Sequence, residues 1–164
     1  MKSLKIALSL VVISLSGCAQ SPLQQQQPKA SISAFAPTPF TPSLYSSPSE
    51  NFQKALKNAA SNCELMQSSG RTMWGMGLEE AANAYRQNLV SCQDWALRNG
   101  STAFSETQKA KRSVALEQAD KILYVKFTSY IGALTIYQEP DLATKNAYKE
   151  AESLQRIEEK TIKK

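Results

Sequence analysis

Apolar side chains recur at helical spacing through residues 50–164 of this chain. Steps of three, four and seven residues join the members of a first stripe, which are Phe52, Leu56, Ala59, Cys63, Met66 and Met73. A second stripe advances by alternating steps of four and three and comprises Leu78, Ala82, Tyr85, Leu89, Cys92 and Ala96. Such spacing places the apolar side chains on one face of an α-helix. The pattern therefore predicts two amphipathic helices joined by a turn at residues 74–77.

Capping residues set the expected ends of these two helices. The first is expected to begin near Ser49, where short polar side chains can accept hydrogen bonds from free backbone N–H groups. Gly70 offers an early end to this helix. The second is expected to run from about Leu78 to Arg98, because the Asn-Gly pair at residues 99–100 is typical of a helix C-terminus.

A long apolar segment that follows predicts a third helix. We expect it to begin within residues 101–105, where Ser105 and Gln108 resemble a capping box, and to end at Tyr137. From Ile122 onward the segment is apolar nearly all round, which favours a position at the centre of a bundle. Its many β-branched and aromatic residues leave a pair of strands as the alternative.

A fourth helix is expected after Pro140, which ends the third, with Asp141 at its start. Its weak apolar stripe lies under a heavily charged face and comprises Ala147, Ala151, Leu154 and Ile157 or Glu158. Glycine and proline are sparse through this part of the chain, which favours helices over a sheet of many strands. The fold class is therefore predicted as all-α, a small bundle of about four helices over residues 50–164.

Residues 18–49 differ in composition from the rest of the chain. They hold six of the seven prolines, a run of four glutamines and one charged side chain, Lys29, with no helical or strand period. Such a segment cannot bury a core, and we expect a flexible, disordered tether. Its aromatic residues, Phe35, Phe40 and Tyr45, could dock in the groove of a partner or lie against the protein's own domain.

The first residues have the pattern of a secretory signal peptide. Lys2 and Lys5 precede an apolar run of about ten residues, which is shorter than the roughly 20 that a membrane-spanning helix needs. The run ends in Leu15-Ser16-Gly17-Cys18, which resembles the lipobox of bacterial lipoproteins. The resemblance implies that residues 1–17 are removed. It also implies that Cys18 carries a diacylglycerol on its sulfur and an acyl chain, such as palmitate, on its amine.

Lipid on Cys18 implies a membrane anchor, because two acyl chains already give stable attachment. In bacterial lipoproteins an Asp after the lipidated cysteine retains the protein in the inner membrane, and Ala19 stands at that position here. The resemblance therefore implies an outer-membrane location, with either the periplasmic or the surface face open. No family is identified for the folded region.

Lipidation of Cys18 leaves an even pair of cysteines, Cys63 and Cys92. In an oxidising envelope compartment such a pair is expected to be bonded. Both lie on apolar stripes at similar distances from the turn at residues 74–77, so a helical hairpin brings them to the same height. The sequence therefore predicts an interhelical disulfide. A redox role is disfavoured, because the chain has no Cys-x-x-Cys motif and no histidine.

The composition excludes most catalytic chemistry. The absence of histidine removes Ser-His-Asp and Cys-His catalysis and the usual zinc sites. Glu79 and Glu80 are neighbours that point about 100° apart on a helix, so they form no acid pair. We therefore expect no enzyme activity, no cofactor and no metal. The net charge of +5 falls to +3 when Lys2 and Lys5 are removed, which does not favour nucleic acid as a partner.

The turn between the first two helices is a candidate partner contact. Met73, Trp74 and Met76 put apolar surface where solvent is expected, and such residues are enriched in interfaces. The alternative is that Trp74 folds back over the end of the bundle.

A basic group is a candidate anionic contact. Lys109, Lys111 and Arg112 lie near the expected start of the third helix, where positive charge opposes the helix dipole. Lipid headgroups, the cell-wall polymer or an acidic partner would suit them. The alternative is a solvated face partly paired with Glu106.

These observations favour a non-enzymatic interaction or assembly subunit of a cell-envelope complex, with the membrane and an envelope protein as partners. Small helical lipoproteins with a disulfide are similar in outline to secretin pilotins, although this likeness concerns architecture alone. The alternative is a periplasmic binding module for an apolar small molecule or lipid. Its cargo would lie among Phe127, Tyr130, Leu134 and Tyr137.

Overall fold

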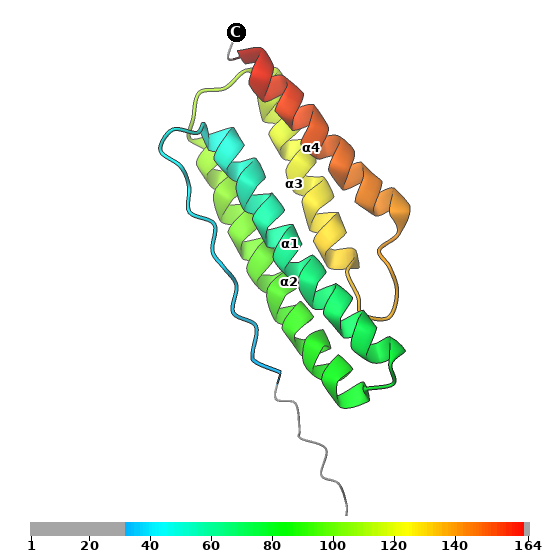
Figure 1. Cartoon of the computed structure of the whole chain (residues 1–164). Helices are drawn as coiled ribbons and strands as arrows, with labels where there is room; N and C mark the ends of the chain where they lie inside the picture. The colour runs from blue at the N-terminus through cyan, green and yellow to red at the C-terminus, as the bar shows by residue number, and fades with distance from the viewer. Residues whose placement is uncertain (1–31, 163–164) are drawn as a thin grey trace, which may run out of the picture.

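The computed structural model describes residues 32–162, which form four α-helices and contain no strand (Figure 1). The helices are α1 (Pro48–Gly75), α2 (Glu79–Gln108), α3 (Val114–Ala133) and α4 (Leu142–Ile162). The predicted all-α bundle is therefore confirmed, and the alternative of a strand pair after residue 122 is excluded. The signal peptide and Cys18 lie outside the described residues.

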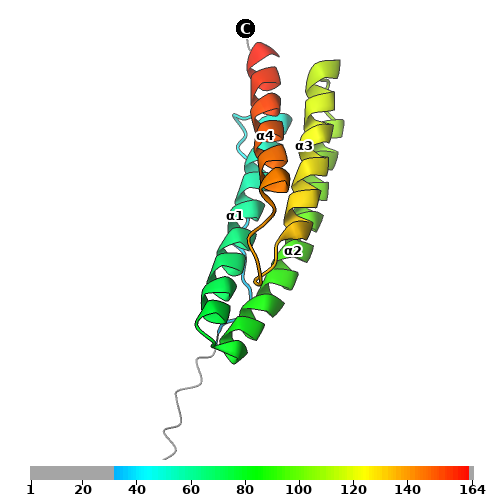
Figure 2. The ribbon, with the colours of Figure 1, turned by 90° about the vertical axis from the view of Figure 1, so that its right-hand side faces the viewer.

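The four helices form two antiparallel pairs. α1 and α2 make a long hairpin, and the shorter pair α3 and α4 lies against the part of it that is distant from the α1–α2 turn (Figure 1). The perpendicular view places α4 beside α1 and α3 beside α2 (Figure 2). The end of the α1–α2 hairpin is therefore left without a helix of the second pair across it.

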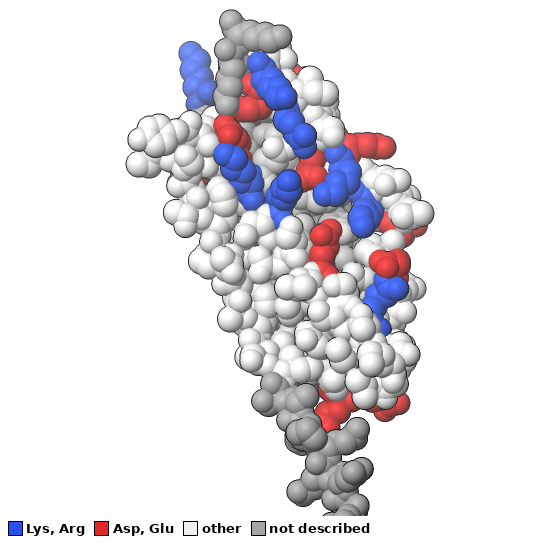
Figure 3. Space-filling model, viewed as in Figure 1, with Lys and Arg blue, Asp and Glu red and all other residues white. Residues whose placement is uncertain are grey.

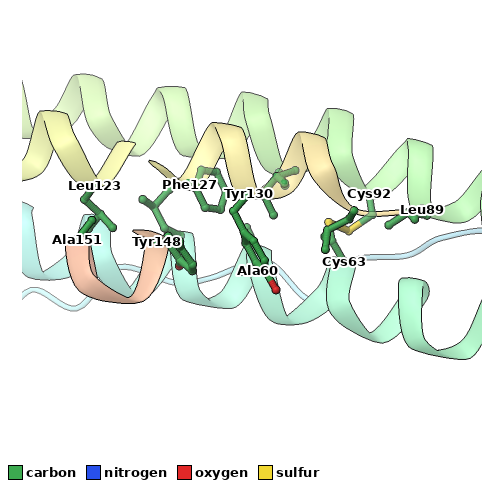
Figure 4. Packing of buried hydrophobic residues seen from close by; sticks show 14 of the residues in the cluster. Ala60, Cys63, Leu89, Cys92, Leu123, Phe127, Tyr130, Tyr148 and Ala151 are labelled. Atoms are coloured by element: carbon green, nitrogen blue, oxygen red, sulfur yellow. A yellow bond between two sulfur atoms is a disulfide. The ribbon is translucent and has the colours of Figure 1, made fainter. Parts of the chain in front are cut away.

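The core fills the space between the pairs. Cys63 of α1 and Cys92 of α2 form the predicted disulfide, with a Cα–Cα distance of 5.5 Å (Figure 4). Further from the α1–α2 turn, Phe127 and Tyr130 of α3 contact Tyr148 of α4. The rings of Tyr130 and Tyr148 stack with 5.2 Å between their centroids. Because Tyr130 belongs to α3 and Tyr148 to α4, this aromatic layer joins α3 to α4.

Two glycines that resemble helix ends lie inside helices. A Cβ atom on Gly100 would meet Phe127 Cε1 at 2.9 Å, and one on Gly70 would meet Ile136 Cγ2 at 2.4 Å. Each glycine therefore permits a close approach by a residue far away in the sequence. The expected end of the second helix at Arg98 is wrong for this reason, and the early end at Gly70 does not occur.

The limits predicted for the third helix are also wrong. Residues 101–105 belong to α2, and α3 begins after Ser113, whose hydroxyl accepts a hydrogen bond from Leu116 N at 3.1 Å. The helix stops at Ala133 instead of Tyr137. Only one face of this segment is buried, since Val125 and Gly132 are exposed.

Glutamine side chains of the first hairpin account for the early end of α3. Gln93 Nε2 donates hydrogen bonds to the carbonyl oxygens of Ile131 and Leu134, at 2.8 and 3.0 Å. Gln67 Nε2 donates to those of Thr135 and Gln138, at 3.2 and 3.1 Å. These amides satisfy carbonyl groups that a helix would otherwise have to pair, and so they stabilise the irregular α3–α4 connection.

Residues 33–47, here called the strap, lie along the first hairpin. Asn88 of α2 accepts a hydrogen bond from Phe35 N at 3.0 Å and donates one to Ser33 O at 2.9 Å. The Phe35 ring is half-buried and meets the Trp95 ring edge-on at 5.9 Å between centroids. Of the two expectations for Phe35, the structure supports contact with the protein's own domain. Tyr45 of the strap is fully exposed.

Candidate interaction surface

The α1–α2 turn ends the first helix with two nested backbone hydrogen bonds. Leu78 N donates to Met73 O, and Gly77 N donates to Trp74 O, both at 3.0 Å. Gly77 has a φ of 72°, a conformation that side chains with a Cβ rarely adopt. This is a Schellman motif, which satisfies the last carbonyl groups of a helix and reverses the chain. The predicted turn at residues 74–77 is confirmed.

Four apolar side chains are exposed around this turn, and we call them the tip patch. Their exposed fractions are 47% for Trp74, 65% for Met76, 43% for Leu78 and 52% for Tyr137. Trp74 and Tyr137 meet edge to face with 5.0 Å between ring centroids. Trp74 thus contacts the end of the bundle through Tyr137 and still exposes about half of its surface. Both expectations for it, an exposed contact and a ring folded over the bundle end, therefore apply in part.

The tip patch differs in membership from the predicted contact. Met73 is half-buried and packs against the core, so it does not belong to the exposed surface. Leu78 was assigned to the second apolar stripe by its spacing, and Tyr137 was expected to end the third helix. Tyr137 instead follows α3 after the helix has ended, and the irregular connection brings it to Trp74. Periodicity alone could not reveal this, because it assumes that the helix continues.

Acidic groups surround the tip patch. Glu79 and Glu80 are exposed in the first turn of α2, and Glu139 forms an ion pair with Arg71. Apolar residues bordered by charged ones are the usual composition of a protein interface. In Figure 3 the Lys and Arg side chains gather on the part of the visible face that carries α4. On this face the part that carries α4 is therefore richer in Lys and Arg than the end with the α1–α2 turn.

The three residues of the predicted anionic contact are not brought together. Lys109 caps the C-terminus of α2, so its charge suits the helix dipole that it was expected to oppose. It pairs with Glu106 at 2.6 Å, as the alternative expected. Lys111 is exposed in the connection to α3, whereas the Arg112 side chain is only 7% exposed. The prediction of one anionic contact is therefore wrong for Arg112.

Arg112 belongs to a buried polar cluster that joins three helices and a connection. Its guanidinium donates to Asp120 Oδ2 of α3. Ser49 of α1 donates to the same oxygen at 2.6 Å, and Gln155 of α4 donates to Asp120 Oδ1 at 3.1 Å. Burial raises the pKa of Asp120, while these three donors lower it. In this cluster the Asp120 carboxylate of α3 accepts hydrogen bonds from α1, from α4 and from the α2–α3 connection, an arrangement that stabilises the packing of the helices.

Two buried phenols and two carboxylates, of which Glu152 is buried and Glu64 partly buried, form a second cluster. Tyr130 donates a hydrogen bond to Glu64, and Tyr148 donates one to Glu152 Oε1 at 3.2 Å. Burial is the main cause that raises the pKa of both phenols, and the nearby carboxylates raise it further. The phenols therefore stay protonated at neutral pH and act as hydrogen-bond donors to the two carboxylates.

Stability above pH 10 should depend on these two phenols. Their raised pKa values mean that the folded state favours the neutral phenol more than the unfolded state does. This stabilisation is complete below the ordinary tyrosine pKa of about 10 and is lost as the pH rises above it. Urea unfolding between pH 8 and 11 should show a steeper loss for the natural chain than for Tyr148→Phe. The exposed residue Tyr137, replaced by Phe, is the control, and an unchanged slope in Tyr148→Phe would contradict the assignment.

The residues expected to hold an apolar cargo do not form one site. Phe127, Tyr130 and Leu134 are buried among the protein's own side chains, while Tyr137 lies in the tip patch. Within residues 32–162, no group of three or more His, Cys, Asp or Glu side chains could hold a metal ion. In the same part of the chain, no helix combines the length and the apolar character needed to cross a membrane.

Comparison of the chain with protein-family models, with curated proteins and with solved structures gives no match.

Proposed function

We propose that the protein is an outer-membrane lipoprotein that acts as a non-enzymatic interaction or assembly subunit of a cell-envelope complex, with the tip patch as its contact surface. The observation that carries this proposal is the clustering of Trp74, Met76, Leu78 and Tyr137 at one exposed end of the bundle. Aromatic and Met side chains are enriched where protein interfaces are fully buried. The lipobox-like residues before Cys18 support the anchor.

The local structure supports a preorganised contact. The disulfide joins α1 to α2 about 20 Å from Met76 along the helix, and the hydrogen bonds around Gly77 fix the turn. A surface that is already ordered loses little conformational entropy on binding.

Trp74→Ala is expected to weaken binding of the envelope partner and so to reduce its recovery with the protein. Central aromatic residues of an interface commonly contribute about 2 kcal/mol or more, which corresponds to a loss of affinity of roughly 30-fold. The measurement is recovery of partners by mass spectrometry after crosslinking in intact cells. Because Trp74 is half exposed, the variant should keep its far-UV circular dichroism spectrum.

Two controls make this measurement decisive. Tyr45→Ala removes a fully exposed aromatic side chain on the strap and should leave recovery of the complex unchanged. Cys18→Ser should lose the mass of the acyl chains that the natural protein carries, which intact-mass spectrometry measures. Equal recovery from Trp74→Ala and the natural chain would show that the tip patch is not the contact.

A further inference from the structure

The described chain begins near the same end of the bundle as the tip patch. Asn88 holds Ser33 and Phe35, and it lies ten residues beyond Leu78 in the sequence, or about 15 Å along the axis of α2. From there the strap runs alongside the hairpin to the start of α1 (Figures 1 and 2). The first described residues, which follow Cys18 in the chain, therefore lie near the tip.

The strap is held at both of its ends. Near Ser33 the Asn88 amide makes two hydrogen bonds to the strap backbone, as a neighbouring strand would, and Phe35 packs on Trp95. Near α1 the Asn51 side chain accepts from Ser43 N at 3.0 Å and donates to Ser43 O at 2.9 Å. These contacts fix the strap, and with it the first described residues, against the first hairpin.

Chain length then orients the molecule on a membrane. Cys18 and Ser33 are 15 residues apart, so the chain between them spans at most about 50 Å. A flexible coil of that length spans only about 20 Å on average, which is enough to bring the tip, about 15 Å from Asn88, to the membrane surface. For the opposite end to do so, the chain would have to run back beside α2 from Asn88 to Gln108, about 30 Å. Attachment near the tip therefore favours an orientation in which the tip patch faces the membrane.

The charge around the tip fits a protein better than a lipid surface. Arg71 is the only Lys or Arg between Lys57 and Arg86 in the sequence, and it is paired with Glu139. The exposed Glu79 and Glu80 flank the patch. Anionic lipid headgroups attract clusters of cations, and the described residues around the α1–α2 turn contain no such cluster.

Resting on the proposed function, we infer that the partner of the tip patch is an integral protein of the membrane that anchors Cys18. The short chain between Cys18 and Ser33 favours a position of the tip near the lipid headgroups, where such a partner exposes its rim. An apolar rim with Lys or Arg opposite Glu79 and Glu80 would complement the patch. A protein of the cell wall or of the aqueous space would instead meet the side or the far end of the bundle.

Photocrosslinking from two surface positions in the full chain tests this inference. A photoreactive amino acid replaces Met76 in the tip patch or Val114 at the far end, both of which are exposed. In intact cells, Met76 should give a protein adduct that stays in the membrane after washing with alkaline carbonate. Val114 should give several-fold less of it, because it is the first residue of α3, at the end of the bundle where α2 ends.

Release of the strap provides the second arm. Phe35→Ala removes the ring contact with Trp95, and Asn88→Ala removes two hydrogen bonds to the strap backbone. Either variant should lower the Met76 adduct several-fold by freeing the bundle to turn. Val90→Ala, at an exposed position on the same helix, is the matched control. Circular dichroism separates this effect from unfolding, and the comparison of Met76 with Val114 stands even if both strap variants unfold.

Each other outcome overturns the inference in a distinguishable way. A lipid adduct alone from Met76 would make the membrane surface the partner. A protein adduct that washes off, or equal adducts from Met76 and Val114, would remove the membrane-embedded partner and leave the interaction function standing. The absence of a protein adduct from both positions would count against the proposed function itself.

Discussion

Arg112→Ala is expected to lower the free energy of unfolding by about 3–5 kcal/mol, the loss usual when one partner of a buried ion pair is removed. The variant leaves the Asp120 carboxylate buried with only Ser49 and Gln155 as donors. Because Asp120 is held by α1, the α2–α3 connection and α4, the loss should reduce the stability of the whole bundle. Urea unfolding followed by circular dichroism measures it.

Matched variants separate the ion pair from charge in general. Lys111→Ala removes an exposed cation from the neighbouring position and should change stability by less than about 0.5 kcal/mol. The double variant Arg112→Met, Asp120→Leu removes both charges and should recover much of the loss, since apolar pairs commonly replace buried ion pairs without cost. Equal losses in the single and double variants would contradict this account.

The deficit of Arg112→Ala should shrink as the pH falls. Burial raises the pKa of Asp120 in the natural chain, and loss of the guanidinium, which lowers it, raises it further. Between the unfolded and folded pKa values the folded state binds the extra proton, so acidification stabilises the variant relative to the natural chain. A deficit that stays constant or grows between pH 7 and pH 4 would show that the lost interaction is not the charge of Arg112.

Sequence spacing was sufficient for the parts of the fold that depend on neighbours along the chain. Alternating steps of three and four predicted the first hairpin, and the placement of Cys63 and Cys92 relative to the turn predicted their disulfide. Both depend on helical periodicity within one continuous pair of helices. Neither requires knowledge of what packs across the hairpin.

Distant contacts decided the features that the sequence could not predict. Asn-Gly at residues 99–100 has the sequence of a helix end, yet Phe127 from α3 needs the space beside Gly100. The basic residues 109–112 were assigned to a helix start because α2 was expected to end too early. The strap has no period, and its position depends on Asn88, which lies 53 residues from Phe35. Such features become visible only when the helices are placed together.

Loss of the Cys63–Cys92 disulfide is expected to lower the free energy of unfolding by about 3–4 kcal/mol. The bond closes a loop of 29 residues, and this value follows from the chain entropy that such a loop removes from the unfolded state. Both cysteines are fully buried, so reductant should act only slowly on the folded protein. Reduction should add two hydrogens to the mass and lower the melting temperature. An unchanged mass after reduction of the unfolded chain would contradict the bond.

The disulfide also bears on the tip patch, because the loop that it closes contains Trp74, Met76 and Leu78 but not Tyr137. A variant with both cysteines replaced by alanine should therefore weaken the contact between Trp74 and Tyr137. The greater mobility of the Trp74 indole should lower its fluorescence anisotropy. If partner recovery falls together with this loosening, the preorganised patch is needed for binding. If anisotropy and recovery stay unchanged while the melting temperature falls, the patch is ordered instead by Gln67 and the connection that it holds. Comparison with Gln67→Ala, which keeps the disulfide, distinguishes these two sources of order.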